Sequence, residues 1–125
     1  MRVPTRYMNI RLLYIADCPH MLPALRLLRA VMRECGIAEE SLQIVEVRNR
    51  EEAEQCQFLG SPTIQVDSAD IEVGRRYDSP VFGCRVYQSE GGIAGVPSIE
   101  MIVSAICGAR PHITRLPSID NGGCR

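Results

Sequence analysis

Residues 9–22 read NIRLLYIADCPHML, and the rest of the chain can be interpreted outward from this stretch. The apolar run from Ile10 to Ile15 is typical of a buried strand. Asp17-Cys18-Pro19-His20 follows it and precedes a leucine-rich segment with helical spacing. A cysteine between a strand and a helix lies where unpaired backbone N–H groups and the helix dipole favour an anion. We therefore expect Cys18 to hold more thiolate than an ordinary cysteine does.

The length and composition of the chain set the broad class. Its 125 residues fit one domain, and 46% hydrophobic and 23% charged residues are ordinary values for a globular protein. The net charge of −1 argues against nucleic acid or an acidic membrane surface as partner. No apolar run approaches the roughly 20 residues that span a bilayer. These features predict a cytoplasmic protein with no nucleic-acid or membrane partner.

The hydrophobic periodicity predicts four strands and three helices in the order β-α-β-α-β-β-α. Strands are expected at 9–16, 42–47, 64–66 and 84–87, helices at 23–35, 49–59 and 98–109, and a long loop at 68–82. The first βαβ unit requires a parallel, right-handed crossover, and the last two strands are most simply antiparallel. The predicted fold class is therefore α/β, a four-stranded mixed sheet with helices on both faces. Residues 1–109 form the predicted domain, and 110–125 a flexible tail.

Six cysteines are spread along the chain at about one per predicted element. This spacing argues against a disulfide framework, and the absence of any Cys-x-x-Cys pair argues against a structural metal site. Cys35 falls on the apolar face of the first helix, where a small buried hydrophobe is expected. Cys56, on the second helix, is expected in the core or at its boundary.

The element order, with Cys18 after the first strand and a proline before the third, resembles the thioredoxin fold. This resemblance implies that Cys18 is the attacking cysteine and that Pro62 is a cis-proline facing it. The substrate groove that it implies is lined by Pro19, Met21, Ser61, Pro62 and Thr63. The family motif is Cys-x-x-Cys, whereas the stretch here is Cys18-Pro19-His20-Met21. Met21 therefore stands where the resolving cysteine would be, and exchange within the motif is excluded.

The first three residues of that stretch also resemble the Cys-Pro-His-Cys of bacterial periplasmic disulfide-introducing enzymes. The resemblance implies that His20, as imidazolium, stabilises the Cys18 thiolate. An exposed His20 with no such role is the alternative.

A further resemblance covers residues 9–109 and points to small bacterial thioredoxin-like proteins of the DF (seleno)protein family, some of them labelled alkylmercury lyase-like. The matching stretches are Asp17-Cys18-Pro19, Phe58-Leu59-Gly60-Ser61-Pro62-Thr63-Ile64, Gly83-Cys84-Arg85-Val86-Tyr87 and Gly95-Val96-Pro97. Some relatives carry selenocysteine at the Cys18 position, which implies nucleophilic redox use there. The chain departs from the family with His20 where asparagine is common and with Ser68-Ala69 where a glycine is usual.

These features together predict a thiol oxidoreductase with one nucleophilic cysteine, Cys18, which attacks either a disulfide, giving a mixed disulfide, or a peroxide, giving a sulfenic acid. Its catalytic residues are Cys18 and His20, and a second thiol from glutathione, Cys84 or Cys56 would complete the cycle. Cys84 is either a buried strand residue or this resolving thiol, and the predicted strand places it away from Cys18. Gly91-Gly92 is either a plain turn or, as in glutaredoxins, a site for a glutathione carboxylate. Glutathione is the expected co-substrate, and neither a metal nor another cofactor is expected.

Two other functions stay open. Cys18 could capture a soft metal such as mercury or copper without catalysis. Alternatively, the groove beside Pro62 could bind a peptide with no chemistry. The expected partners are a protein or small-molecule thiol or disulfide. The sequence makes no prediction of the oligomeric state.

Overall fold

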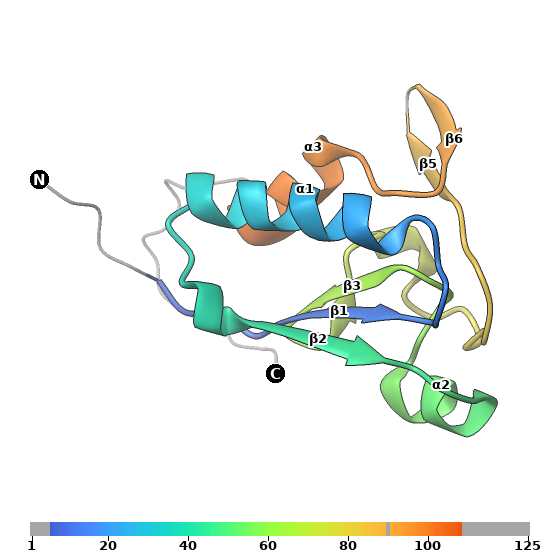
Figure 1. Ribbon diagram of the computed structural model, residues 1–125. Coiled ribbons are helices and arrows are strands. Elements are labelled where there is room, and N and C mark those ends of the chain that lie inside the picture. The colour runs from blue at the N-terminus through green and yellow to red at the C-terminus, as the bar shows by residue number, and fades with distance from the viewer. Residues whose placement is uncertain (1–5, 90, 109–125) are drawn as a thin grey trace, which may run out of the picture.

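The computed structural model describes residues 6–89 and 91–108 (Figure 1). The helices are α1 (Met21–Glu34), α2 (Arg50–Cys56) and α3 (Ile99–Ile106), and the strands are β1 (Ile10–Tyr14), β2 (Leu42–Glu46), β3 (Thr63–Val66), β4 (Ala69–Asp70), β5 (Tyr87–Ser89) and β6 (Gly92–Ala94). Short 3₁₀ turns lie at Glu39–Ser41 and Val73–Arg75. The tail predicted at 110–125 lies outside the described residues.

The main sheet has four strands in the order β2-β1-β3-β4. β1 pairs with β2 in parallel, and β3 is antiparallel to both β1 and β4. Leu12 of β1 lies opposite Ile44 on one side and Ile64 on the other. The predicted four-stranded mixed α/β sheet is confirmed.

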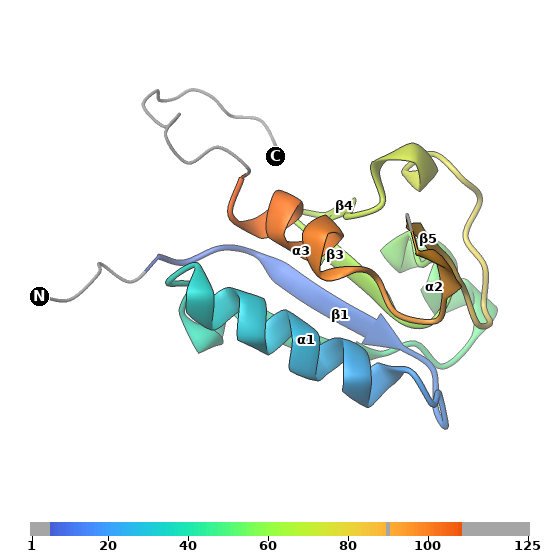
Figure 2. The ribbon, with the colours of Figure 1, turned by 90° about the horizontal axis from the view of Figure 1, so that it is seen from above.

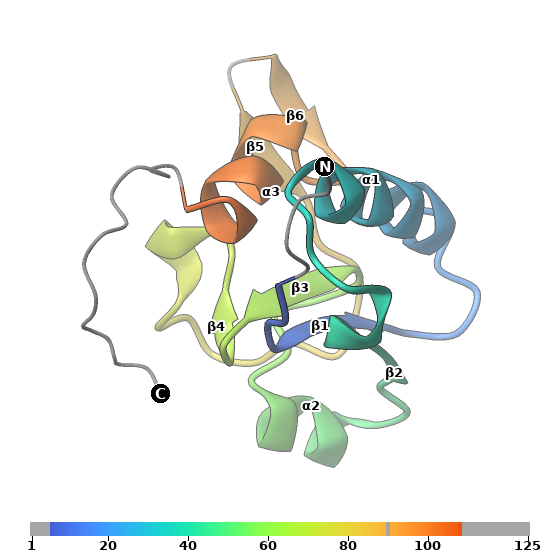
Figure 3. The same cartoon turned by 90° about the vertical axis from the view of Figure 1, so that its left-hand side faces the viewer.

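The helices cover both faces of this sheet. Figures 2 and 3 show α1 and α3 side by side over one face, with α2 alone on the other. The α1/α3 side holds the larger apolar cluster, which is made of Ile10, Leu12, Ala24, Leu25, Leu28, Val31, Met32, Ile37, Ile64, Ile71, Ile102 and Ile106. A smaller cluster under α2 consists of Leu13, Val47, Ala53 and Phe58. The alternation of β1 side chains between these clusters fixes its register.

The residues of α1 follow the helical pattern read from the sequence. Leu25, Leu28 and Met32, which recur at helical spacing in the sequence, are buried. The helix begins at Met21, earlier than the predicted start, and ends before Gly36, whose φ of 72° suits a glycine that stops a helix.

The two shorter helices are capped by side chains as the sequence indicated. The Asn49 side chain accepts a hydrogen bond from the Glu52 N–H at the start of α2, and Ser98 accepts one from the Met101 N–H at the start of α3. The predicted end of the second helix at Gly60 is wrong, because the left-handed Gln57 (φ 59°) ends α2 first.

The fourth strand differs from the prediction. Asp67 and Ser68 both have positive φ (53° and 71°), which suits a two-residue turn, and β4 pairs with β3 directly after them. The predicted fourth strand at 84–87 is therefore wrong. Only Tyr87 of that stretch belongs to a strand, and its strand, β5, forms a separate two-stranded sheet with β6. This hairpin projects from the main body in Figure 1.

The buried face of α3 is narrow. Ile102 and Ile106 are buried, but Ile99 and Val103 are 47% and 37% exposed. With eight residues, α3 turns only one apolar stripe toward the sheet.

Candidate active site

The segment between β1 and α1 carries Cys18. A hydrogen bond from the Cys18 N–H to the Ile15 carbonyl (3.3 Å) closes a turn in which Asp17 is left-handed (φ 64°). Met21, the first residue of α1, donates its N–H to the Cys18 carbonyl at 3.4 Å. Cys18 thus lies between β1 and α1, just before the helix, as the sequence predicted. Its thiol is free and half-buried.

A side chain from the loop before β3 joins this segment. Ser61 Oγ accepts a hydrogen bond from the Ile15 N–H at 3.1 Å. The peptide bond between Ser61 and Pro62 is cis, the conformation that the resemblance implied. Ser61, Pro62 and Thr63 are all buried. The cis-proline loop is therefore tied to the residues that lead into Cys18.

The chain around Cys84 runs beside the same loop. The Ser61 N–H donates to the Gly83 carbonyl (2.7 Å), and the Arg85 N–H donates to the Ser61 carbonyl (3.2 Å), so that Cys84 and Ser61 form a bridge. The expectation that Cys84 lies away from the Cys18 end of the sheet is wrong. It rested on a fourth strand at 84–87, whereas this segment pairs with Ser61 and leaves Cys84 exposed with a free thiol.

The two segments approach so closely that Gly60 has no room for a side chain. A Cβ atom there would lie 2.7 Å from the Arg85 Cβ and 3.1 Å from the Cys84 carbonyl oxygen. The φ of Gly60 is also 111°, a value that favours glycine. Gly60 therefore permits the contact between the cis-proline loop and the Cys84 segment.

A buried ion cluster holds the Cys84 segment in place through Arg85. The Arg85 side chain is 1% exposed and pairs with Asp70 and Glu72, each at 2.8 Å. Arg85 also donates to Thr63 Oγ1 at 3.2 Å. Burial by itself would lower the pKa of the guanidinium, but its acidic partners outweigh this effect and raise the pKa. Of the buried side-chain nitrogens and oxygens in the described part of the chain, Arg85 Nε alone lacks a hydrogen-bond partner.

Tyr87 completes this cluster and reaches the cis-proline. Its hydroxyl donates to the Pro62 carbonyl, and the Arg85 guanidinium carbon lies 4.1 Å from the centre of its ring. Burial raises the pKa of Tyr87 well above its usual value, although the Arg85 charge opposes the shift. The hydroxyl therefore stays protonated and able to donate at neutral pH.

His20 and the glycine pair occupy less central positions than expected. His20 is the exposed N-cap residue of α1, and its ring lies against Gly95, where an added Cβ would come within 2.4 Å of the imidazole. Among the described residues, no hydrogen bond joins His20 to Cys18. Gly91 and Gly92 lie at the turn of the β5–β6 hairpin, where Gly92 pairs with Ser89.

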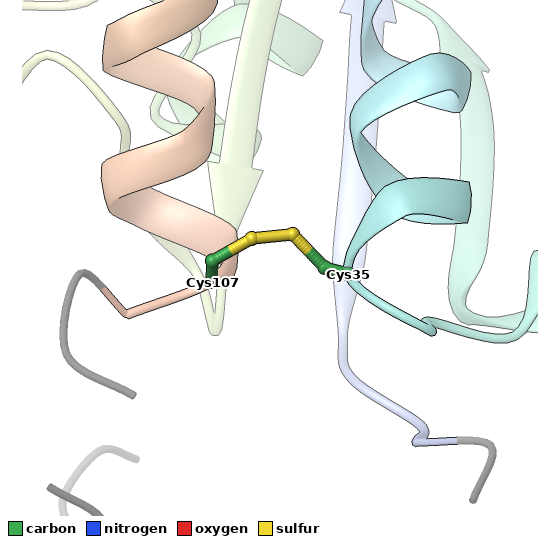
Figure 4. The surroundings of a disulfide bond; sticks show 2 residues. All are labelled: Cys35 and Cys107. Carbon is green, nitrogen blue, oxygen red and sulfur yellow. A yellow bond between two sulfur atoms is a disulfide. The ribbon is translucent and has the colours of Figure 1, made fainter. Parts of the chain in front are cut away.

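The remaining described cysteines take no part in the pairing with Ser61. Cys56 is free and half-buried at the end of α2. Cys35 and Cys107, at the C-terminal ends of α1 and α3, form a disulfide with Cα atoms 5.7 Å apart (Figure 4). The expectation of Cys35 as a plain buried hydrophobe is therefore wrong. The disulfide lies at the opposite end of α1 from Cys18.

Sequence reasoning missed the ion cluster of Asp70, Glu72 and Arg85. Asp70 and Glu72 fall in the predicted long loop, and such charged residues are expected in solvent because they are rarely fully buried. One signal was available in the sequence. In an alternating segment, Arg85 and Tyr87 lie on the same side, so a buried Tyr87 would have predicted that the charged Arg85 side chain is buried as well.

Comparison with protein-family models, curated proteins and solved structures finds no match for this chain. In the residues that the structure describes, no three or more His, Cys, Asp or Glu side chains gather as metal ligands would. No helix within 6–89 and 91–108 is long and apolar enough to cross a membrane. The site is therefore interpreted from its own geometry.

Proposed function

We propose that this chain is a thiol oxidoreductase with a thioredoxin-like fold, in which Cys18 is the nucleophile and Cys84 is the second thiol. One observation carries the proposal. Ser61 accepts from the Ile15 N–H through its side chain and pairs with Gly83 and Arg85 through its main chain. The segments of both free thiols are thereby attached to the same residue, next to the cis-proline.

The sheet supports the thioredoxin-like part of the proposal. Its order is β2-β1-β3-β4, with α1 and α3 on one face and α2 on the other (Figure 3). The cis peptide before β3 and the cysteine after β1 agree with the resemblance. The cytoplasmic location expected from the sequence stays a prediction.

The chemistry needs two exchange steps. The Cys18 thiolate attacks one sulfur of a substrate disulfide, a Cys18–substrate bond forms, and the other half leaves as thiolate. The Cys84 thiolate then attacks the Cys18 sulfur and releases the second half, so that the substrate gains two electrons and the chain gains a Cys18–Cys84 disulfide. Two glutathione molecules then reduce this disulfide in two exchange steps, which restore both thiols and release glutathione disulfide.

Three single substitutions test the proposal. Turnover of bis(2-hydroxyethyl) disulfide with glutathione is expected to disappear in Cys18→Ser and to fall in Cys84→Ser. Cys56→Ser is the matched control, because Cys56 is a free cysteine on α2 that lacks the bridge to Ser61. Unchanged turnover in Cys18→Ser would refute the proposal.

The same variants separate the other functions. Full turnover in Cys84→Ser would mean that glutathione alone resolves Cys18, the monothiol route. Stoichiometric binding of Cu(I) that needs Cys18 but comes without turnover would support a soft-metal module instead. Peptide binding that survives in Cys18→Ser would support an interaction domain.

A further inference from the structure

The main chain beside the cis-proline is already paired. An extended polypeptide that docks at a sheet edge uses unpaired N–H and C=O groups of that edge. Pro62 has no N–H, and the Ser61 N–H donates to the Gly83 carbonyl at 2.7 Å. No main-chain donor of Ser61 or Pro62 is left for a substrate.

The acceptors of the same loop also have internal partners. The Ser61 carbonyl accepts from the Arg85 N–H, and the Pro62 carbonyl accepts from the Tyr87 hydroxyl. The Gly60 carbonyl accepts from the Thr63 hydroxyl. The chain itself thus occupies the edge that a substrate strand would need.

The occupying segment is not easily displaced. Arg85 is held by Asp70 and Glu72, and moving it would leave a carboxylate that is 4% exposed without its partner. The Val81 N–H also donates to the Phe58 carbonyl at 2.8 Å, which extends the pairing along the loop before the cis-proline. A polypeptide would have to compete with these interactions.

From this pairing we infer that the site takes low-molecular-weight disulfides and not extended polypeptide substrates. The inference rests on the proposed function of Cys18. The exposed Cys84 and the half-buried Cys18 stay reachable for a small molecule, which needs no strand pairing. Cys18 forms the mixed disulfide, and Cys84 displaces the second half as thiolate. Two external thiol molecules, themselves oxidised to one disulfide, then return two electrons to the chain.

Two matched reagents test the inference on the full chain. Both are mixed disulfides of 5-thio-2-nitrobenzoate, one with N-acetylcysteine methylamide and one with a neutral, capped peptide of about six residues, long enough for a strand. Each releases the same coloured thiolate when Cys18 attacks. The rate that belongs to Cys18 is the difference between wild type and Cys18→Ser.

The peptide reagent is expected to react with Cys18 no faster than the small one. A Cys18 rate at least about tenfold higher for the peptide, the factor that two added main-chain hydrogen bonds would supply, overturns the inference and leaves the proposed function intact. No difference between wild type and Cys18→Ser with either reagent overturns the proposed function, and the inference with it.

Discussion

The hydrogen bond between Tyr87 and Pro62 is one of the contacts that attach the cis-proline loop to the buried ion cluster, and Tyr87→Phe removes it with little other change. The Tyr87 side chain is 1% exposed, and its hydroxyl donates to the Pro62 carbonyl. Phenylalanine keeps the ring, so the stacking of Arg85 at 4.1 Å is retained. The substitution therefore leaves one buried carbonyl without its partner.

The size of the effect follows from that lost partner. Leaving a buried acceptor unsatisfied costs about 1–3 kcal/mol, and we expect a loss of about 2 kcal/mol in the free energy of unfolding. With an m-value of about 2 kcal/mol/M in urea, the unfolding midpoint falls by about 1 M.

Urea unfolding followed by circular dichroism measures this loss. Tyr77→Phe is the matched control, because the Tyr77 side chain is 100% exposed and its hydroxyl is in water. Its midpoint should stay at the wild-type value. If Tyr87→Phe loses less than about 0.5 kcal/mol, the range of ordinary surface substitutions, the Tyr87–Pro62 contact does not hold the loop and the reasoning fails.

Three further predictions concern the ion pair of Asp70, the Cys35–Cys107 disulfide and the Tyr87 hydroxyl. Asp70→Asn should lower the free energy of unfolding by about 3 kcal/mol, because Arg85 then keeps only Glu72 as a charged partner. Since the pair is buried, this loss should change little with added salt, and a loss below about 1 kcal/mol would contradict the prediction. Cys107→Ser should lower the free energy of unfolding by about 4 kcal/mol under oxidising conditions, because the disulfide closes a loop of sequence separation 72. A reductant should lower the stability of wild type to that of the variant, and a difference that persists with reductant would count against this prediction. Burial raises the pKa of Tyr87 in the folded state, so the contribution of its protonated hydroxyl to stability is complete below about pH 10, where the unfolded tyrosine titrates, and declines at higher pH. In urea unfolding measured at several pH values, the difference in the free energy of unfolding between wild type and Tyr87→Phe should become smaller above about pH 10. A difference that stays constant would refute the raised pKa of Tyr87.

The elements with strong periodicity could be predicted from the sequence. The apolar run of β1 and the Leu25-Leu28-Met32 stripe of α1 each bury one recognisable face, and the caps Asn49 and Ser98 satisfy backbone N–H groups by their local chemistry. Such signals lie within a few residues of one another. The order of the first three strands and three helices along the chain followed from them.

The arrangement around Cys84 could not be predicted, because it depends on residues distant in the sequence. Ser61 pairs with a segment more than 20 residues away, and this pairing requires Gly60 to admit the Arg85 side chain. The Cys35–Cys107 disulfide joins residues separated by 72 positions, and spacing alone shows no sign of it. Local patterns predicted a strand at 84–87, and tertiary pairing overrode them.

Peptide mapping after a single oxidation tests whether Cys18 attacks and Cys84 resolves. The full chain is treated with one equivalent of glutathione disulfide, and its cysteine-containing peptides are identified by mass spectrometry without reduction. The account predicts a new disulfide between Cys18 and Cys84 with Cys56 still a free thiol. Cys18 recovered as a free thiol while Cys84 or Cys56 carries glutathione would contradict it.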